Sequence, residues 1–222
     1  SQPTGTFMGI PAGELADVSG GSVIFGAPCA TPYPSVGAYC KDAPNAIRSA
    51  ISMYQANISH MDFDLGGPIF PNGVNAIDLG DLEFSESDSA GNRERIRATT
   101  AGIIERGAVP IVIGGDDSIP IPMIAAFAET GEYTVVQIDA HIDYRDEVSG
   151  EKLGLSSTMR RAFEMPHVTS LIQVGQRGIG SARPQDFADA KAHGVKFVSA
   201  REVAATGIQQ VIDLVPAGAK VI

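Results

Sequence analysis

The sequence predicts an α/β protein with a mostly parallel sheet covered by helices on both faces. From residue 91 onward, helical segments and short apolar runs alternate without interruption, which is typical of such three-layer folds. The composition agrees, with 44% hydrophobic and 19% charged residues, 25 glycines and 14 prolines. At 222 residues the chain is long enough for a sizeable core, and we expect one domain over 1–222.

The elements follow from apolar runs bounded by turn residues and from periodic segments with capping residues. For example, Ser118 or Asp117 can cap a helix that has Pro120 in its first turn. Strands are predicted at 22–26, 75–80, 110–114, 133–139, 170–175, 195–199 and 218–222. Helices are predicted at 44–56, 91–107, 119–130, 157–164, 184–194 and 201–215, with loops at 66–73 and 83–92.

The most informative segment follows the predicted strand at 133–139. If the extended geometry persists, Asp139, His141 and Asp143 point to one side, because strand side chains alternate. Two carboxylates and an imidazole are costly together unless a cation neutralises them. Oxygen and imidazole donors suit a borderline or hard divalent metal, so the sequence predicts a metal site here.

A second acidic segment strengthens this interpretation. Asp116 and Asp117 end the strand at 110–114, and strand, helix and strand within about thirty residues form a βαβ unit. We expect its two strands to be parallel and adjacent, so that Asp117 shares one sheet edge with Asp139. The alternative is that the two acids only cap the following helix.

These residues resemble two signature motifs of the ureohydrolases, the family that includes arginase and agmatinase. The motifs are Ile-Gly-Gly-Asp-Asp-Ser at 113–118 and Ile-Asp-Ala-His-Ile-Asp at 138–143. The resemblance extends to Phe-Met-Gly-Ile-Pro at 7–11, Ala-Pro-Asn-Ala-Ile-Arg at 43–48 and Asp-Leu-Gly-Asp at 78–81, and so covers nearly the whole chain. It is agmatinase-like, and the stretch at 145–161 looks more like members that act on small guanidines.

The resemblance implies an arginase-like fold and a site with two divalent ions, manganese or nickel. In the family pattern Asp139 bridges the metals, His141 binds one, and Asp117 and Asp143 bind the other. A water with a lowered pKa is the nucleophile, so no side chain is matched as catalytic. The implied activity is hydrolysis of agmatine, guanidine, an alkylguanidine or a biguanide to urea or a urea derivative, in a homo- or hetero-oligomer, trimeric or hexameric.

The chain departs from the family pattern in three places. Asp117 stands where the family has a histidine, and the loop at 144–157 lacks the histidine usual in agmatinases. The family's Ser-x-Asp-x-Asp motif does not occur, and the chain reads as truncated within the strand at 218–222. We therefore expect residues 1–222 alone to be catalytically silent. These departures keep open the alternative of a non-catalytic paralogue that supports an active partner.

Net charge and cysteine content narrow the partners. A net charge of -10 disfavours nucleic acid and anionic membranes, and agrees with a small cationic substrate. Asp146 and Glu147 are candidate substrate-binding residues, although they can equally be solvated. No apolar run is long enough to span a membrane, and two cysteines are too few for a disulfide framework, so a cytoplasmic location is expected.

Two further features are predicted to be structural. His60, His167 and His193 are isolated in the sequence, and we expect surface or capping positions. Arg160 and Arg161 are expected to form a solvated helix face or a subunit contact.

Overall fold

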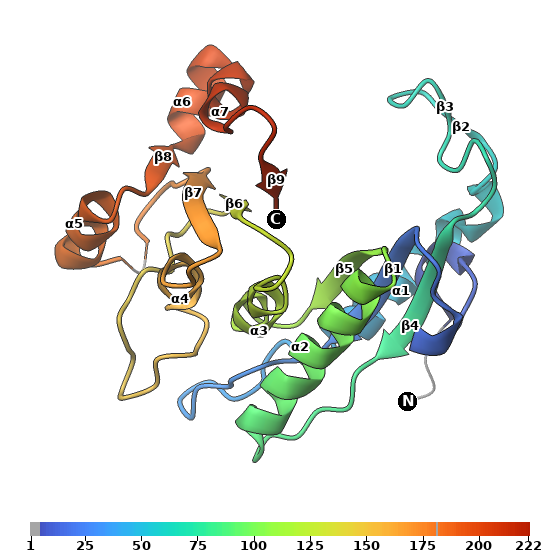
Figure 1. The fold of residues 1–222 in the computed structure, drawn as a ribbon, viewed down its shortest axis with the longest axis horizontal. Coiled ribbons are helices and arrows are strands. Elements are labelled where there is room, and N and C mark those ends of the chain that lie inside the picture. The colour runs from blue at the N-terminus through green and yellow to red at the C-terminus, as the bar shows by residue number, and fades with distance from the viewer. Residues whose placement is uncertain (1–4, 181) are drawn as a thin grey trace. The chain divides into compact units, whose positions relative to one another are not determined.

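The computed structural model describes residues 5–180 and 182–222. The chain divides into two compact units, Ser1–Ile119 and Pro120–Ile222 (Figure 1). Each unit holds its own parallel sheet with helices on both faces, which agrees with the predicted three-layer α/β class. The prediction of one domain over 1–222 stays a prediction.

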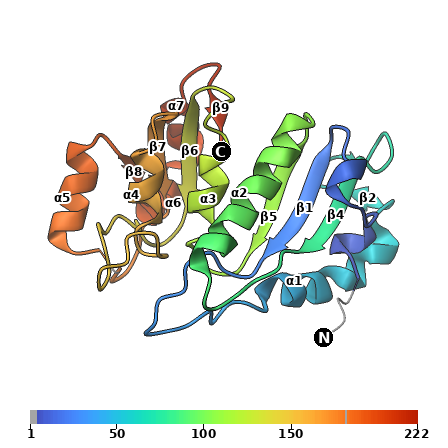
Figure 2. The same ribbon diagram turned by 60° about the horizontal axis from the view of Figure 1, so that its bottom comes forward.

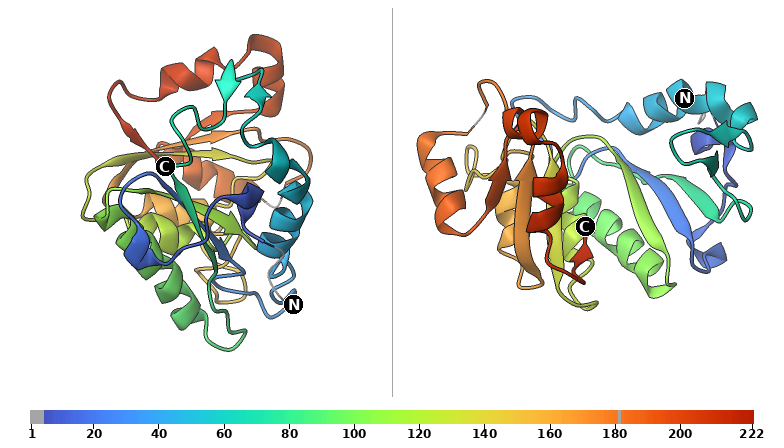
Figure 3. Two further views of the ribbon diagram at one scale, coloured as in Figure 1. Left: turned by 90° about the vertical axis from the view of Figure 1, so that its right-hand side faces the viewer. Right: turned by 90° about the horizontal axis from the view of Figure 1, so that it is seen from above.

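The first unit is built on a three-stranded parallel sheet with the order β4-β1-β5. The chain moves from β1 to β4 on one side and then to β5 on the other, so right-handed crossovers place the connecting helices on opposite faces (Figure 3). Ile24, Ala76 and Ile113 from the three strands pack with Ile10 in a small core. The elements are β1 (Ser22–Ala27), α1 (Ala43–Ile51), β4 (Ala76–Asp81), α2 (Ser89–Glu105) and β5 (Val109–Gly114).

Short elements that the sequence did not predict complete this unit. An antiparallel pair, β2 (Met61–Asp62) and β3 (Gly67–Pro68), lies within and just before the segment predicted as a loop. Three short 3-10 helices are also present, at Phe7–Gly9, Leu15–Asp17 and Ser52–Asn57. The last of these extends α1, so the predicted helix at 44–56 is right in extent and changes its winding at Ser52.

The second unit is built on a four-stranded parallel sheet with the order β8-β7-β6-β9. The helix α4 lies on one face of β7 and α6 on the other (Figure 2). The strands are β6 (Tyr133–Ile138), β7 (Val168–Val174), β8 (Lys196–Val198) and β9 (Lys220–Val221). The helices are α3 (Pro120–Ala125), α4 (Thr158–Phe163), α5 (Pro184–Ala192), α6 (Ala200–Thr206) and α7 (Gln209–Leu214).

The side chains of β7 alternate between the two cores of this unit. Leu171 joins the core beneath α4, together with Ile124, Tyr144 and Met159. Ile172 joins the opposite core, with Val211 of α7. Because side chains alternate along a strand, Gln173 lies on the same side of the sheet as Leu171, which is the side that α4 covers.

Three predictions about elements are wrong. The helix predicted at 119–130 is α-helical only as far as Ala125. Beyond it the chain forms turns in which a backbone N donates to the carbonyl three residues earlier, such as Phe127 N to Ile124 O. The helix predicted at 201–215 is broken by Gly207, whose φ of 78° is accessible to glycine and ends α6. The strands β5 and β6 are not neighbours, because β5 pairs with β1 while β6 pairs with β7 and β9. Among the described residues, no helix is long and apolar enough to cross a membrane.

Candidate metal centre

The candidate ligands of the second unit follow β6. This strand ends at Ile138, so the extended geometry that was expected to align Asp139, His141 and Asp143 does not persist. Instead Asp139 Oδ1 accepts a hydrogen bond from the His141 backbone N at 2.7 Å, which turns the chain. The Asp139 backbone N still donates to Val174 O at 2.9 Å, which fixes the start of the turn to β7.

This turn, and not the alternation of side chains along a strand, brings two carboxylates together. Asp139 and Asp143 each offer a carboxylate oxygen, and these atoms lie within 4.8 Å of one another. Asp143 is only 7% exposed. His141 does not belong to this group: its side chain is half exposed, and its Nδ1 lies 3.4 Å from Asp139 Oδ1.

The donor chemistry of Asp139 and Asp143 fits a divalent cation. Two negative charges this close repel each other, and a cation between them removes that repulsion. Oxygen ligands lie about 2.0–2.6 Å from Mg or Ca ions, so oxygens within 4.8 Å of each other can share one ion. Carboxylate donors favour hard ions such as Mn over softer ones.

Asp117 belongs to the first unit, in the loop after β5. The residues on either side of it are fixed to the loop after β1. Ser118 Oγ accepts from the backbone N of Ala30 and Thr31 at 3.2 and 2.9 Å. Gly115 must be glycine, since a Cβ there would lie 1.8 Å from Pro28 O. Asp117 is therefore held in a rigid loop, and its meeting with Asp139 stays a prediction.

Asp116 has a structural role in the same loop. It is 5% exposed, and its Oδ1 accepts from Ser118 N at 3.1 Å and Ser118 Oγ at 2.5 Å. Its Oδ2 accepts from Cys29 Sγ at 3.2 Å. Burial first, and then the Asp116 charge, raises the pKa of the Cys29 thiol to about 12, so Cys29 stays protonated. Asp116 thereby organises the turn before α3, and the alternative that both acids only cap this helix stays a prediction.

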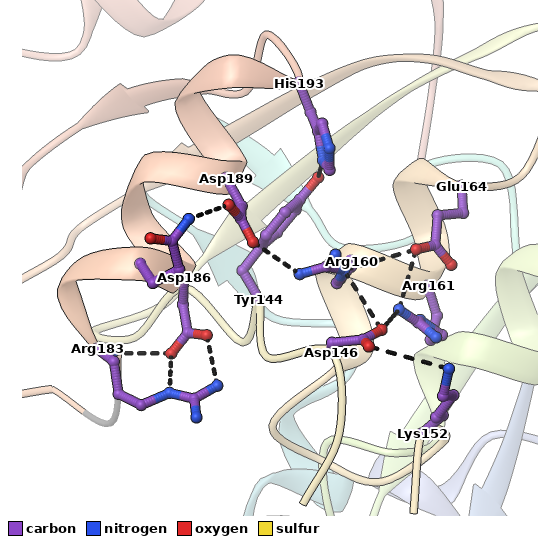
Figure 4. A network of polar contacts seen from close by, with 11 residues as sticks. Tyr144, Asp146, Lys152, Arg160, Arg161, Glu164, Arg183, Asp186, Asp189 and His193 are labelled. Atoms are coloured by element: carbon purple, nitrogen blue, oxygen red, sulfur yellow. Dashed lines mark hydrogen bonds and ion pairs between the residues drawn. The ribbon is translucent and has the colours of Figure 1, made fainter.

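The loop after Asp143 is tied to α4 by ion pairs (Figure 4). Asp146 lies 2.9 Å from Arg161 Nη2, 3.7 Å from Arg160 Nε and 3.9 Å from Lys152 Nζ. A hydrogen bond from Arg161 lowers the pKa of Asp146. Glu147 is exposed. The substrate-binding role of both acids stays a prediction, but the charge of Asp146 is already balanced within the chain.

The arginines of α4 differ from the prediction. The side chains of Arg160 and Arg161 are only 17% and 11% exposed, so they do not form a solvated face. Arg160 also bonds Asp189 of α5 at 3.2 Å, and Arg161 bonds Glu164 at 2.9 Å. Their charges are paired with acids of the loop, α4 and α5, which joins these three segments.

His60 is exposed and His193 caps α5, which agrees with the predicted surface or capping positions, whereas His167 is buried, so the prediction is wrong for that residue. His167 is 8% exposed, and its Nε2 lies 2.9 Å from Ile124 O in α3. His193 caps the C-terminus of α5, and its Nδ1 lies 2.8 Å from the Tyr144 hydroxyl (Figure 4). Tyr144 is 1% exposed, and burial raises its pKa to about 12.

Comparison with known proteins agrees with this arrangement. The model of the arginase family matches residues 21–220. The chain belongs to the arginase family. The earlier resemblance to ureohydrolases is thereby confirmed.

Relatives within this family differ in what their names say they act on. A formimidoylglutamase from Halalkalibacterium halodurans is 31% identical over 177 residues, which is 77% of this chain and 53% of the relative. The structure of proclavaminate amidino hydrolase from Streptomyces clavuligerus is 26% identical with a TM-score of 0.82, over 98% of this chain and 71% of that chain. The agmatine ureohydrolase of Thermoplasma volcanium is 26% identical with a TM-score of 0.72, over 91% and 65%.

This arginase-family chain spans only part of its curated relatives. It covers 53%, 57% and 59% of the length of three curated relatives that it matches. These matches show that the chain has the fold of the family, and the arginase-like architecture is as predicted.

Two residues near Asp143 were missed in the sequence. Gln137 and Gln173 occupy opposite positions on β6 and β7, and Gln173 is fully buried. A signal was present, because each glutamine follows two apolar residues near the C-terminal end of its strand. Buried amides in such positions require hydrogen-bond partners, and polar partners near a strand end indicate a site.

Proposed function

We propose that this arginase-family protein is a metal-dependent hydrolase that cleaves a C–N bond of a guanidino compound. The observation that supports this most directly is the approach of the Asp139 and Asp143 carboxylates to within 4.8 Å at the end of β6. The signature motif of the family places metal ligands at these same positions. The names of similar proteins support this class of reaction, since they include an amidino hydrolase and an agmatine ureohydrolase.

In this proposal Asp117, Asp139, His141 and Asp143 hold two divalent ions, manganese or nickel. When bound, the ions supply a water whose pKa falls from 15.7 towards about 7, so that a nucleophile forms at neutral pH. Asp139 would supply a full negative charge that offsets the repulsion between the ions. His141 is half exposed in the structure, and its Nδ1 lies 3.4 Å from Asp139 Oδ1.

The substrate is proposed to be a small cationic guanidino compound, namely agmatine, guanidine, an alkylguanidine or a biguanide. The net charge of -10 favours the approach of a cation. Glu147 is exposed and contributes to that field, and Asp146 does so less because Arg161 neutralises it. The product is urea or a urea derivative. A cytoplasmic, oligomeric protein, trimeric or hexameric, is part of the same proposal.

The test joins metal content to turnover. The gene product that contains residues 1–222 is purified with Mn2+ or Ni2+ and assayed for urea release from guanidine, alkylguanidines and agmatine. Asp139→Asn should keep the fold, lose bound metal by elemental analysis and lose turnover, because the bridging position needs full charge. Asp64→Asn, a change at an exposed acid of the first unit, serves as the matched control. Equal metal content in the Asp139 variant and the parent would refute the ligand assignment.

A second function is favoured by one residue. Asp117 stands where the family has a metal-binding histidine, and it adds negative charge to the site. A paralogue with a weakened site can support an active subunit in a hetero-oligomer without turnover of its own. Metal binding that depends on Asp139, together with silence toward every substrate and metal, would favour this function over the first.

A further inference from the structure

Two glutamines of the second unit form a directed hydrogen-bond chain toward Asp143. Gln137 and Gln173 face each other across β6 and β7, on the side of the sheet that α4 covers. Gln173 Nε2 donates to Gln137 Oε1, and Gln137 Nε2 donates to Asp143 Oδ2 at 2.9 Å. Gln173 is 0% exposed, so its amide is a costly group to place here without a role.

The groups at the two ends of this series of hydrogen bonds fix its direction. The Asp143 carboxylate only accepts hydrogen bonds, so the Gln137 NH2 group must face it. At the other end, Gln173 Nε2 also donates to Ile142 O at 2.7 Å, which holds the Gln173 amide in its orientation. Because Gln173 occupies Gln137 Oε1, the Gln137 amide cannot turn over without losing both bonds.

The backbone of Asp143 is restrained as tightly as its side chain. Its φ of 43° lies in the left-handed region, which a residue with a Cβ adopts at a cost. Its carbonyl accepts from the backbone N of Met159 and Arg160, in the first turn of α4, at 3.1 and 3.4 Å. The preceding carbonyl, Ile142 O, is held by Gln173. An unfavourable conformation fixed by three elements indicates that the direction of this side chain matters.

We propose that Gln137 is a positioning residue that holds the Asp143 carboxylate for metal ligation, with Gln173 locking Gln137 behind it. The inference rests on the proposed metal site. It explains why two strands carry an amide directly after apolar residues. A metal ligand that is already oriented loses less rotational freedom when the ion binds. Partners of this kind, which orient the ligands without touching the metal, typically change metal affinity by 10–100-fold when they are removed.

The test measures metal binding without turnover. The gene product that contains residues 1–222 is titrated with Mn2+, and the free ion is followed by its electron paramagnetic resonance signal. Gln137→Met removes the donor and keeps the side-chain length, and we expect its Kd for Mn2+ to rise roughly 10–100-fold. Gln209→Met, a change at an exposed glutamine of α7 that bonds only Asp213 among the described contacts, is the matched control and should leave Kd unchanged.

A second variant covers the case in which Gln137→Met does not fold. Gln137→Asn keeps an amide in β6 but withdraws it from Asp143 by one methylene, so it should weaken Mn2+ binding in the same direction. Urea unfolding of the metal-free variants measures their stability separately. A variant that is less stable but binds Mn2+ with the parent's Kd would show a purely structural glutamine and overturn the inference alone. A parent that binds no Mn2+ would overturn the inference together with the proposed metal site.

Discussion

Arg48 of α1 and Asp78 of β4 form a bidentate ion pair that is almost completely buried. Arg48 Nε and Nη2 donate to the two carboxylate oxygens of Asp78, each at 2.8 Å. Arg48 and Asp78 are 2% and 1% exposed. Arg48 also bonds Asp81, and Asp78 accepts from the backbone N of Phe7 at 2.8 Å. The pair therefore joins α1, β4 and the N-terminal segment of the first unit.

Removing the arginine should strongly destabilise the protein. Arg48→Met leaves Asp78 buried without its main partner, and breaking such a pair costs about 3–5 kcal/mol in the free energy of unfolding. Arg97→Met is the matched control, because Arg97 pairs with Glu94 at the surface and exposed pairs contribute about 0–1 kcal/mol. Urea unfolding monitored by circular dichroism measures both. Equal losses in the two variants would contradict a structural role for the buried pair.

The same pair makes stability depend on acid pH. Burial opposes ionisation of Asp78, but hydrogen bonds from Arg48, Phe7 and Gly80 outweigh it and lower its pKa. A carboxylate with a lowered folded pKa contributes stability above its unfolded pKa of about 3.9, and this contribution is lost as pH falls through the folded pKa. We expect the free energy of unfolding to decrease below about pH 4.

The variant Asp78→Asn separates this effect from general acid unfolding. It cannot ionise, so it should be less stable than the parent at pH 7 and should lose less stability between pH 5 and pH 3. Chemical unfolding at a series of pH values gives both slopes. A parent and variant with parallel pH profiles would show that Asp78 does not titrate in this range.

The sequence predicted the strands and helices well because their signals are local. Apolar runs such as Val109–Gly114 and the proline at the start of α5 indicate their elements without help from distant contacts. The grouping of strands into sheets was less accessible. Order along the chain predicted β5 beside β6, but β5 pairs with β1, and β6 pairs with β7 and β9.

The candidate site was predicted in part for the same reason. The identity of Asp139 and Asp143 came from a motif, and the structure brings their carboxylates together. The geometry came from a different cause than expected, since the Asp139 side chain turns the chain by bonding His141 N. The supporting glutamines were missed because their role depends on the pairing of β6 with β7, which a single sequence does not show.

The acids of the loop after Asp143 should differ in their effect on a cationic substrate. Asp146 lies within 4.0 Å of three cationic side chains, whereas Glu147 is exposed. If the loop attracts the guanidinium group, Glu147→Gln should raise KM with little change in kcat, and Asp146→Asn should raise it less. Steady-state kinetics at low and high salt measures both, because screening reduces long-range attraction. A larger KM effect for Asp146→Asn would indicate direct contact with the substrate.

Asp117→His tests whether residue 117 is a metal ligand. In the first unit its loop is fixed by Ser118 and Gly115, so the substitution should leave the fold intact. Imidazole favours nickel relative to manganese more than a carboxylate does, and the change also removes one negative charge. At equal supply of the two ions, the purified variant should therefore show a higher ratio of nickel to manganese than the parent, by elemental analysis. Asp64→His at an exposed position is the control for adventitious binding to an added histidine. An unchanged ratio in Asp117→His would place residue 117 outside the metal site. It would also overturn the expectation that both motifs meet at one sheet edge.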